Sequence, residues 1–170
     1  MNKGLLKNIV VAINGSQSSV QAAMYGIILS RQYSLNMKAV YVVDTATIKF
    51  LTSQNFLVSE EKESYEVQLK ADGKTYLDYV ENLASSKGLK IETELREGSV
   101  WTEIINAADE CEADMILLGG HEPSDKYANG KRTDPYRSVA VTTRNSIVNY
   151  ARCPVLVIHK PEIEALFKIL

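Results

Sequence analysis

The chain has few of the residues from which disulfide frameworks and zinc sites are built. Its 170 residues include two cysteines, Cys111 and Cys153, and two histidines. Two cysteines in a chain of this length do not make a disulfide framework, and no cysteine or histidine spacing is typical of zinc ligands. We therefore expect two reduced thiols and no metal site.

An excess of one charge and a long hydrophobic run are also lacking. Nineteen Lys and Arg residues against 21 Asp and Glu residues leave a formal net charge of −2. This balance gives no electrostatic reason to expect nucleic acid or a membrane surface as a partner. The N-terminus carries only a short apolar run, which predicts neither a signal peptide nor a spanning helix. We expect a cytoplasmic protein.

Motifs of efficient catalysis are missing as well. The sequence contains no Gly-x-x-x-x-Gly-Lys-Ser/Thr motif, and we find no nucleophile–base–orienter set and no pair of catalytic carboxylates. His121 is a lone histidine on a predicted loop, without a cysteine or an acid at metal-ligand spacing. We name no catalytic residue, and the sequence does not predict an enzyme.

What the chain does have is a regular alternation of predicted strands and helices. Short apolar or β-branched runs predict strands at residues 8–13, 38–43, 89–95, 114–118 and 155–159. Apolar residues three or four apart predict helices at 17–32, 60–85, 100–111 and 142–152, whereas residues 45–57 are interpreted as a loop with at most a short helical turn. The fold class is therefore α/β, a doubly wound, five-stranded parallel sheet sandwiched by helices.

The helix ends carry their own signals. Ser16 and Ser99 are predicted N-caps, and Thr142 and Thr143 can cap the last helix of the domain. The helix at 100–111 is expected to place four apolar residues on its core face: Trp101, Ile104, Ile105 and Ala108.

We divide the chain into a domain at residues 1–160 and a short helical extension at 161–170. The extension has Pro161 at its start and an apolar face of Ile163, Leu166, Phe167 and Leu170. Ten residues form a marginal helix alone, so this helix must dock on its own domain or on a partner subunit. The sequence favours neither.

The stretch from Ala113 to Pro154 points to a ligand site. A buried strand ends in Gly119-Gly120, and a long polar loop follows it. In open α/β sheets, ligands bind at the carboxyl ends of the strands. The loop after Leu118 is therefore the first place to look for function.

Four stretches together resemble one family. They read Ile-Val-Val-Ala-Ile-Asn-Gly-Ser at 9–16, Val-Tyr-Val-Val-Asp at 40–44, Glu-Gly at 97–98 followed by Ala-Asp-Met-Ile-Leu-Leu-Gly at 113–119, and Cys-Pro-Val-Leu-Val at 153–157. Their order and spacing resemble the universal stress protein (UspA-like) family over residues 8–159. The resemblance implies an adenine nucleotide α-hydrolase-like, Rossmann-like fold. It also implies a cytoplasmic stress-response protein that pairs as a homodimer through the last strand, Val155–His159.

Some members of that family bind ATP or AMP, and others bind no nucleotide. By resemblance, adenine would lie near the strand ends and the phosphates near glycines and helix starts, where N–H groups face an anion. The implied contacts are Ala12, Ile13, Asn14, Ser16, Val42, Gly119, Gly120, Thr142 and Thr143. Asn14 stands where binders usually hold Asp and makes a poorer Mg²⁺ ligand. It can equally serve as a turn residue.

The family's glycine-rich loop is altered in this chain. Glu122 stands in place of the second glycine, and the closing Gly-Ser pair falls on Val141-Thr142 instead of 132–133, which makes the loop nine residues longer (141 against 132). Lys131 and Arg132 within this loop belong either to a solvated segment or to a phosphate grip that replaces the glycines.

Two functions follow from these observations. One is a stress regulator that acts mainly through protein contacts, with a degraded nucleotide motif. The other is an ATP- or AMP-binding regulator with a rebuilt phosphate loop, at most slow ATP hydrolysis, and Mg²⁺ only if ATP binds. The altered loop and Asn14 favour the first, and the intact strand ends and helix caps support the second.

Overall fold

The computed structural model of the protein describes residues 5–54, 59–120 and 135–170, and only the backbone at 59–60 and 135–141. In these ranges the elements are β1 (Asn8–Ile13), α1 (Gln17–Tyr33), β2 (Asn36–Val43), α2 (Thr45–Ser53), α3 (Ser59–Ser86), β3 (Glu92–Glu97), α4 (Val100–Glu110), β4 (Met115–Gly119), α5 (Pro135–Tyr150), β5 (Val155–Ile158) and α6 (Ile163–Ile169). The strands form one sheet in the order β3-β2-β1-β4-β5, and every neighbouring pair is parallel. The predicted doubly wound α/β fold is confirmed.

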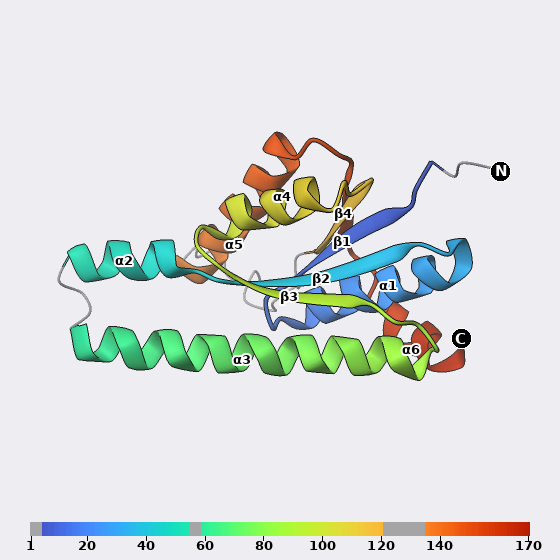
Figure 1. Cartoon of the computed structure of the whole chain (residues 1–170), viewed down its shortest axis with the longest axis horizontal. Coiled ribbons are helices and arrows are strands. Elements are labelled where there is room, and N and C mark those ends of the chain that lie inside the picture. Colours follow the sequence, from blue (N-terminus) through green and yellow to red (C-terminus); the bar gives the residue numbers. More distant parts are fainter. Residues whose placement is uncertain (1–4, 55–58, 121–134) are drawn as a thin grey trace, which may run out of the picture.

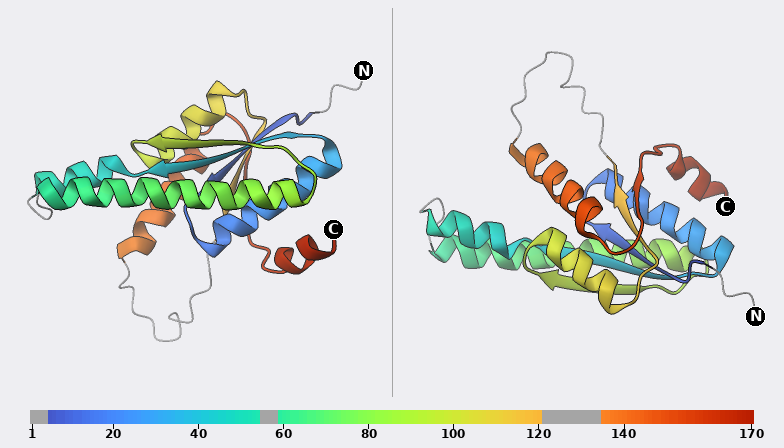
Figure 2. Two further views of the ribbon diagram at one scale, coloured as in Figure 1. Left: turned by 60° about the horizontal axis from the view of Figure 1, so that its bottom comes forward. Right: turned by 90° about the horizontal axis from the view of Figure 1, so that it is seen from above.

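Helices cover both faces of the sheet. Figures 1 and 2 show α1, α3 and α6 on one face and α4 and α5 on the other. Each face of the sheet carries its own hydrophobic core, and strand β1 contributes to both because successive side chains point to opposite faces. Ile9, Val11 and Ile13 pack toward α1 and α3, and Val10 and Ala12 pack toward α4 and α5.

Among the helices that the structure describes, none combines the length and the apolar character that a membrane span requires.

The segment predicted to be a loop at 45–57 contains a helix, so that prediction is wrong for residues 45–53. Asp44 caps α2, since its Oδ1 accepts a hydrogen bond from the Thr47 N–H at 3.0 Å. Ile48 is buried beneath the helix. The many β-branched residues of α2 conceal its period, and this packing stabilises it nonetheless. Figure 1 shows α2 and the first turns of α3 extending past the ends of the strands.

Strand β3 begins later than predicted, at Glu92 instead of residue 89. The N–H of Leu89 donates to the carbonyl of Ala84 at 3.0 Å, and Gly88 has a φ of +71°. Leu89 therefore belongs to the C-terminal turn of α3, whose hydrogen-bonding pattern is that of a Schellman motif. The predicted strand at 89–95 therefore combined two elements, the turn at the end of α3 and the strand itself.

Helix α5 begins at Pro135, seven residues before the predicted start at Thr142 (142 against 135). Proline suits the first helical position because its fixed φ is helical and its missing N–H is not needed there. Thr142 and Thr143 consequently lie inside α5, and the prediction that they cap this helix is wrong.

Helix α4 differs from its prediction at three residues: Ser99, Trp101 and Ile105, which is only partly buried and lies outside the hydrophobic core cluster. Ser99 is the N-cap, but its side chain makes no capping hydrogen bond. Trp101 is 36% exposed and packs against Tyr150 with ring centroids 5.5 Å apart and ring planes tilted by 35°, so it does not join the core. Ala107, fully buried, occupies the core face together with Ile104 and Ala108.

The C-terminal helix α6 packs on α1 of the same chain (Figure 2). Ile163 and Phe167 are buried, whereas the other two residues of the predicted face, Leu166 and Leu170, are exposed. Glu164 Oε1 accepts hydrogen bonds from Gln17 and Gln21 of α1, at 2.8 and 2.9 Å. These two hydrogen bonds lower the pKa of the Glu164 carboxyl.

Candidate functional site

A cavity of about 380 Å³ opens at the carboxyl ends of β1, β2 and β4. This volume lies at the lower end of the range of small-molecule sites. The polar residues that line it are Asn14, Ser16, Ser18, Ser19, Asp44, Thr47, Thr143 and Arg144. The remaining lining residues are apolar, aromatic or glycine: Ala12, Ile13, Tyr41, Val42, Val43, Ile48, Leu51, Tyr65, Leu69, Val100, Ile104, Leu118, Gly119 and Ile147.

The topology of the sheet explains the position of the cavity. The chain leaves β1 into α1 on one face and leaves β4 into α5 on the other, although β1 and β4 are neighbours. The connections diverge at this point and leave a crevice, which is where open α/β sheets bind ligands. The loop region after Leu118, selected from the sequence, begins at this crevice.

Asn14 and Ser16 build the start of α1, which lines the cavity. Ser16 Oγ accepts a hydrogen bond from the Ser19 N–H at 3.1 Å, so the predicted N-cap is confirmed. Asn14 Oδ1 accepts hydrogen bonds from the Ser16 N–H at 3.0 Å and from Ser16 Oγ at 2.7 Å. Gly15 between them has a φ of +83°, which favours glycine. Asn14 therefore closes the turn before the helix.

Gly119 is required for packing between β4 and α1. A Cβ atom at this position would lie 2.6 Å from the Ser18 carbonyl carbon and 2.7 Å from the Ser19 nitrogen. The absence of a side chain thus lets the end of β4 approach the first turn of α1. Gly120 is buried but is not one of the residues that line the cavity. Its N–H donates to the Ile158 carbonyl of β5 at 2.7 Å.

Arg144 of α5 places a positively charged side chain at the cavity. Its Nη2 donates to the Gly120 carbonyl oxygen, at a distance of 3.4 Å. Thr143 and the buried Ile147 line the cavity from the same helix. Among the lining residues that the structure describes, Arg144 carries the positive charge and Asp44 the negative charge.

Helices α2 and α3 form an apolar wall of the cavity. Ile48 and Leu51 come from α2, and Tyr65 and Leu69 come from α3. Tyr41 of β2 lies against this wall, and its ring stacks on Tyr76 of α3, with centroids 6.3 Å apart. Burial raises the pKa of the Tyr41 hydroxyl, which keeps the hydroxyl protonated at neutral pH.

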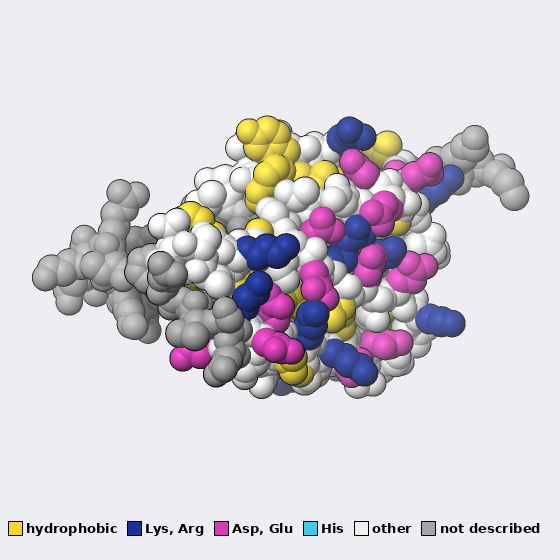
Figure 3. All heavy atoms as spheres, turned by 60° about the vertical axis from the view of Figure 1, so that its left-hand side comes forward, with side chains coloured by type: hydrophobic (Ala, Val, Ile, Leu, Met, Phe, Trp, Pro, Cys, Tyr) yellow, Lys and Arg dark blue, Asp and Glu magenta, His cyan; other side chains and the backbone are white. Residues whose placement is uncertain are grey.

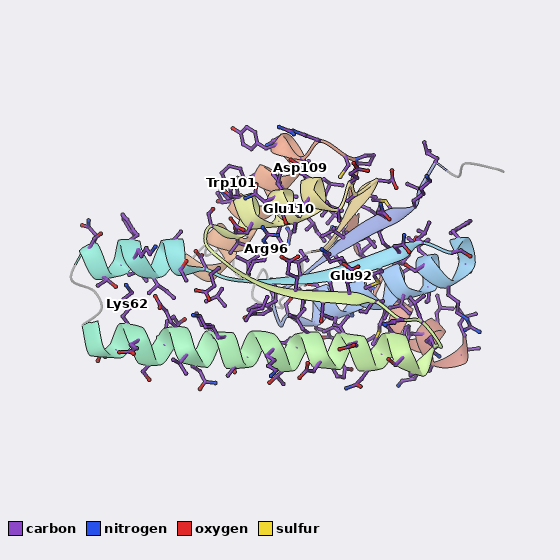
Figure 4. All side chains as sticks on the ribbon, viewed as in Figure 1. Lys62, Glu92, Arg96, Trp101, Asp109 and Glu110 are labelled. Atoms are coloured by element: carbon purple, nitrogen blue, oxygen red, sulfur yellow. The ribbon has the colours of Figure 1, made fainter. Side chains whose placement is uncertain are left out.

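A second group of charged residues lies on the edge strand β3 and on the adjacent helix α4, where its members form ion pairs. Arg96 of β3 donates to both carboxylate oxygens of Glu110 at 2.8 Å; Figure 4 labels these two residues. Arg96 also donates to Glu94 and Glu103, at 2.9 Å each. The hydrogen bond to Glu110 is the largest cause of the raised pKa of Arg96. Because this bidentate pair joins β3 to α4, we assign the cluster a structural role. Figure 3 shows positive and negative side chains interspersed on the visible face of the molecule.

The structure brings most of the sequence-predicted site residues to the cavity. Ala12, Ile13, Asn14, Ser16, Val42, Gly119 and Thr143 line it. Gly120 and Thr142 are not among the lining residues, and Lys131 and Arg132 lie outside the described residues.

Sequence reasoning missed Arg144 and the wall from α2 and α3. Arg144 stands two positions after Thr142 and next to Thr143, so a search extended by one helical turn would have included it. Asp44, directly after a predicted strand, could have been found by the rule that placed Asn14 at the site.

Comparison with known proteins identifies similar chains. Residues 6–159 match the sequence model of the universal stress protein family. A universal stress protein of Methanocaldococcus jannaschii is 32% identical over 164 residues, which cover 95% of this chain and 87% of that protein.

Two solved structures show the same fold. A universal stress protein family member from Burkholderia pseudomallei has a TM-score of 0.66 at 23% identity, covering 91% of this chain and 97% of that chain. The universal stress protein from Archaeoglobus fulgidus in complex with dAMP has a TM-score of 0.60 at 16% identity, covering 92% and 100%.

Proposed function

This chain belongs to the universal stress protein family, and we propose that it is an adenine-nucleotide-binding regulator of the stress response. The observation that carries the proposal is the cavity at the switch point of the sheet, which combines apolar walls, a helix start and one arginine. Small-molecule sites have this composition, mostly apolar with a few polar groups that orient the ligand.

The lining residues divide into two regions that suit the two parts of a nucleotide. The apolar residues Ala12, Val42 and Leu118 offer a surface for a purine ring. The start of α1 at Ser16 and the guanidinium of Arg144 offer positive potential for a phosphate. The Archaeoglobus fulgidus relative, whose structure contains dAMP, supports this class of ligand.

A thermal-unfolding measurement with AMP tests the proposal. A ligand at 100 times its Kd stabilises a folded protein by about 2.7 kcal/mol. In a domain of this size, about 2–4 °C of Tm accompanies each kcal/mol, so we expect Tm to rise by roughly 5–10 °C.

A cavity-filling variant and a matched surface variant show whether AMP raises Tm by binding in this cavity. Ala12→Leu places extra carbon atoms in the cavity and should abolish the AMP-dependent rise in Tm. Ala71→Leu makes the same change on the exposed surface of α3 and should leave the rise intact. An AMP-dependent rise that persists in Ala12→Leu would place the ligand elsewhere.

A regulator that acts through protein contacts is the second candidate. It is favoured by α6, which leaves Leu166, Ile169 and Leu170 exposed, at 40%, 82% and 51%. The same Tm measurement separates the candidates, because a protein of this kind shows no response to AMP at millimolar concentration.

We also propose that two copies pair through β5. This strand lies at the edge of the sheet, and its Val155, Leu156 and Val157 are only half-buried. An unpaired strand edge is a template for another strand. Light scattering during size-exclusion chromatography should give the mass of a dimer at micromolar concentration, and a monomer throughout would contradict this pairing.

A further inference from the structure

We propose that Arg144 is the residue that binds the ligand's phosphate, and that the site takes its nucleotide without a magnesium ion. The inference rests on the proposed nucleotide site and names the charge state of its ligand. The expected ligand class is a nucleoside monophosphate, whose negative charge one guanidinium and one helix start can balance.

The position of Arg144 suits this role. Arg144 and the buried Ile147 are three residues apart on α5 and line the same cavity, so they share one helix face. The 3.4 Å hydrogen bond to the Gly120 carbonyl uses one of the five N–H donors of a guanidinium. The other donors can serve a phosphate, for which the planar fork is well suited.

Arg144 differs from the other partly buried arginine that the structure describes in detail. Arg96 is surrounded by three glutamates and bonds each of them. Among the described residues, no carboxylate forms an ion pair with Arg144. A phosphate group would supply the anionic partner that the described part of the chain does not offer to this guanidinium.

The start of α1 adds positive potential near the same point. Gly119 lies directly against Ser18 and Ser19 in the first turn of that helix, and Gly120, which accepts the Arg144 hydrogen bond, is the next residue. The end of β4 is therefore in contact with both the start of α1 and the guanidinium. Helix starts and arginines both favour anions.

The oxygen ligands at the cavity do not fit a magnesium ion. Mg²⁺ demands near-octahedral oxygen ligands, of which proteins supply one or two carboxylates. Asn14 Oδ1 is already engaged by the Ser16 N–H and the Ser16 hydroxyl. The two oxygens of Asp44 accept from the Thr47 N–H at 3.0 Å and from Thr47 Oγ1 at 2.6 Å. Both lone pairs of Asn14 Oδ1 are therefore used, and a cation there would disrupt the turn. Asp44 is then the one carboxylate that the described lining residues offer, and its two oxygens already hold the cap of α2.

The test is a calorimetric titration of nucleotide-free protein with AMP and with adenosine, each in the presence of Mg²⁺ and of EDTA. The variants are Arg144→Gln, Arg144→Lys and a control, Arg152→Gln, whose side chain is 83% exposed and lies 3.5 Å from Asp109. We expect Arg144→Gln to weaken AMP binding by about 10- to 100-fold, the range for hydrogen bonds to charged groups. Adenosine affinity should stay within about twofold, and Arg152→Gln should bind as the wild type does.

Arg144→Lys keeps the charge and loses the planar fork, so its AMP affinity should lie between those of the wild type and Arg144→Gln. The AMP affinity of the wild type should be the same in Mg²⁺ and in EDTA. If Arg144→Gln does not fold, the ratio of AMP to adenosine affinity in the wild type and in Arg144→Lys decides the question.

Each contrary result has a distinct meaning. If the wild type binds neither AMP nor adenosine, both the nucleotide site and this inference are wrong. If it binds AMP and Arg144→Gln binds it equally well, the site stands and the role of Arg144 does not. Equal losses for AMP and adenosine would show that Arg144 only supports the fold, and a large gain in affinity with Mg²⁺ would overturn the metal-free site.

Discussion

Substitution of Gly119 by alanine separates two roles that a glycine can have beside a phosphate site. A glycine can allow the backbone to approach the ligand, or it can allow two elements of the protein to approach each other. The structure supports the second role for Gly119, because an added Cβ would lie 2.6–2.7 Å from backbone atoms of Ser18 and Ser19. Backbone atoms in the first turn of a helix cannot move aside as a side-chain end can.

The expected cost follows from this geometry. A β-carbon contact below 3.0 Å requires β4 or α1 to shift, and overpacking of this kind costs about 1–3 kcal/mol. In a domain of this size, that loss corresponds to a decrease in Tm of roughly 2–12 °C. No backbone strain adds to it, since Gly119 is not among the glycines with positive φ.

Thermal unfolding of Gly119→Ala and of a matched control, Gly26→Ala, measures the effect without ligand. Gly26 lies within α1, and its added Cβ would meet side-chain atoms of Val11, Leu117 and Met37 at 3.0–3.4 Å. Alanine also favours a helix interior by about 1 kcal/mol, so the control should stay within about 1 kcal/mol of the wild type. A Gly119→Ala protein as stable as the wild type, with lower AMP affinity, would refute the packing argument.

Three further outcomes follow from the structure. Phe167→Ala removes a buried aromatic ring that packs α6 on α1 and should cost about 3 kcal/mol in urea unfolding, whereas truncation of the 82% exposed Ile169 should cost nothing measurable. The pKa of Glu164 is lowered in the folded state, so its contribution to stability is present above its unfolded pKa and is lost as pH falls through the folded pKa; Glu164→Gln should therefore flatten the stability profile below about pH 4.5. Burial raises the pKa of the Cys111 and Cys153 thiols, so iodoacetamide should alkylate both more slowly at pH 8 in the folded protein than in urea.

The sequence predicted the sheet and its cores well, for physical reasons. Buried strands such as Asn8–Ile13 are short continuous apolar runs, and the glycine turns that end them are visible in the chain. Tertiary packing overrode local signals elsewhere. Thr45–Ser53 is rich in β-branched residues and has no clear helical period, yet the Asp44 cap and the burial of Ile48 make it a helix.

Only part of the site could be predicted from the sequence. The ends of strands can be recognised in a sequence, whereas the helices that form the cavity's other walls cannot be assigned to it. Ala12, Asn14 and Val42 follow from the rule that ligands meet the carboxyl ends of strands. Arg144 could not be found this way, because it lies in the first turn of the helix predicted at 142–152 and does not follow a strand end. Tyr65 reaches the cavity only because α3 is long enough to extend past the sheet.

The measurement that tests the central claim most directly is a calorimetric titration of nucleotide-stripped wild-type protein with AMP. The account predicts one site per chain with a Kd in the micromolar range, equivalent to about −8 kcal/mol. Absence of heat at millimolar AMP, in a sample shown to be folded, would contradict the nucleotide site and would favour a regulator that works through protein contacts.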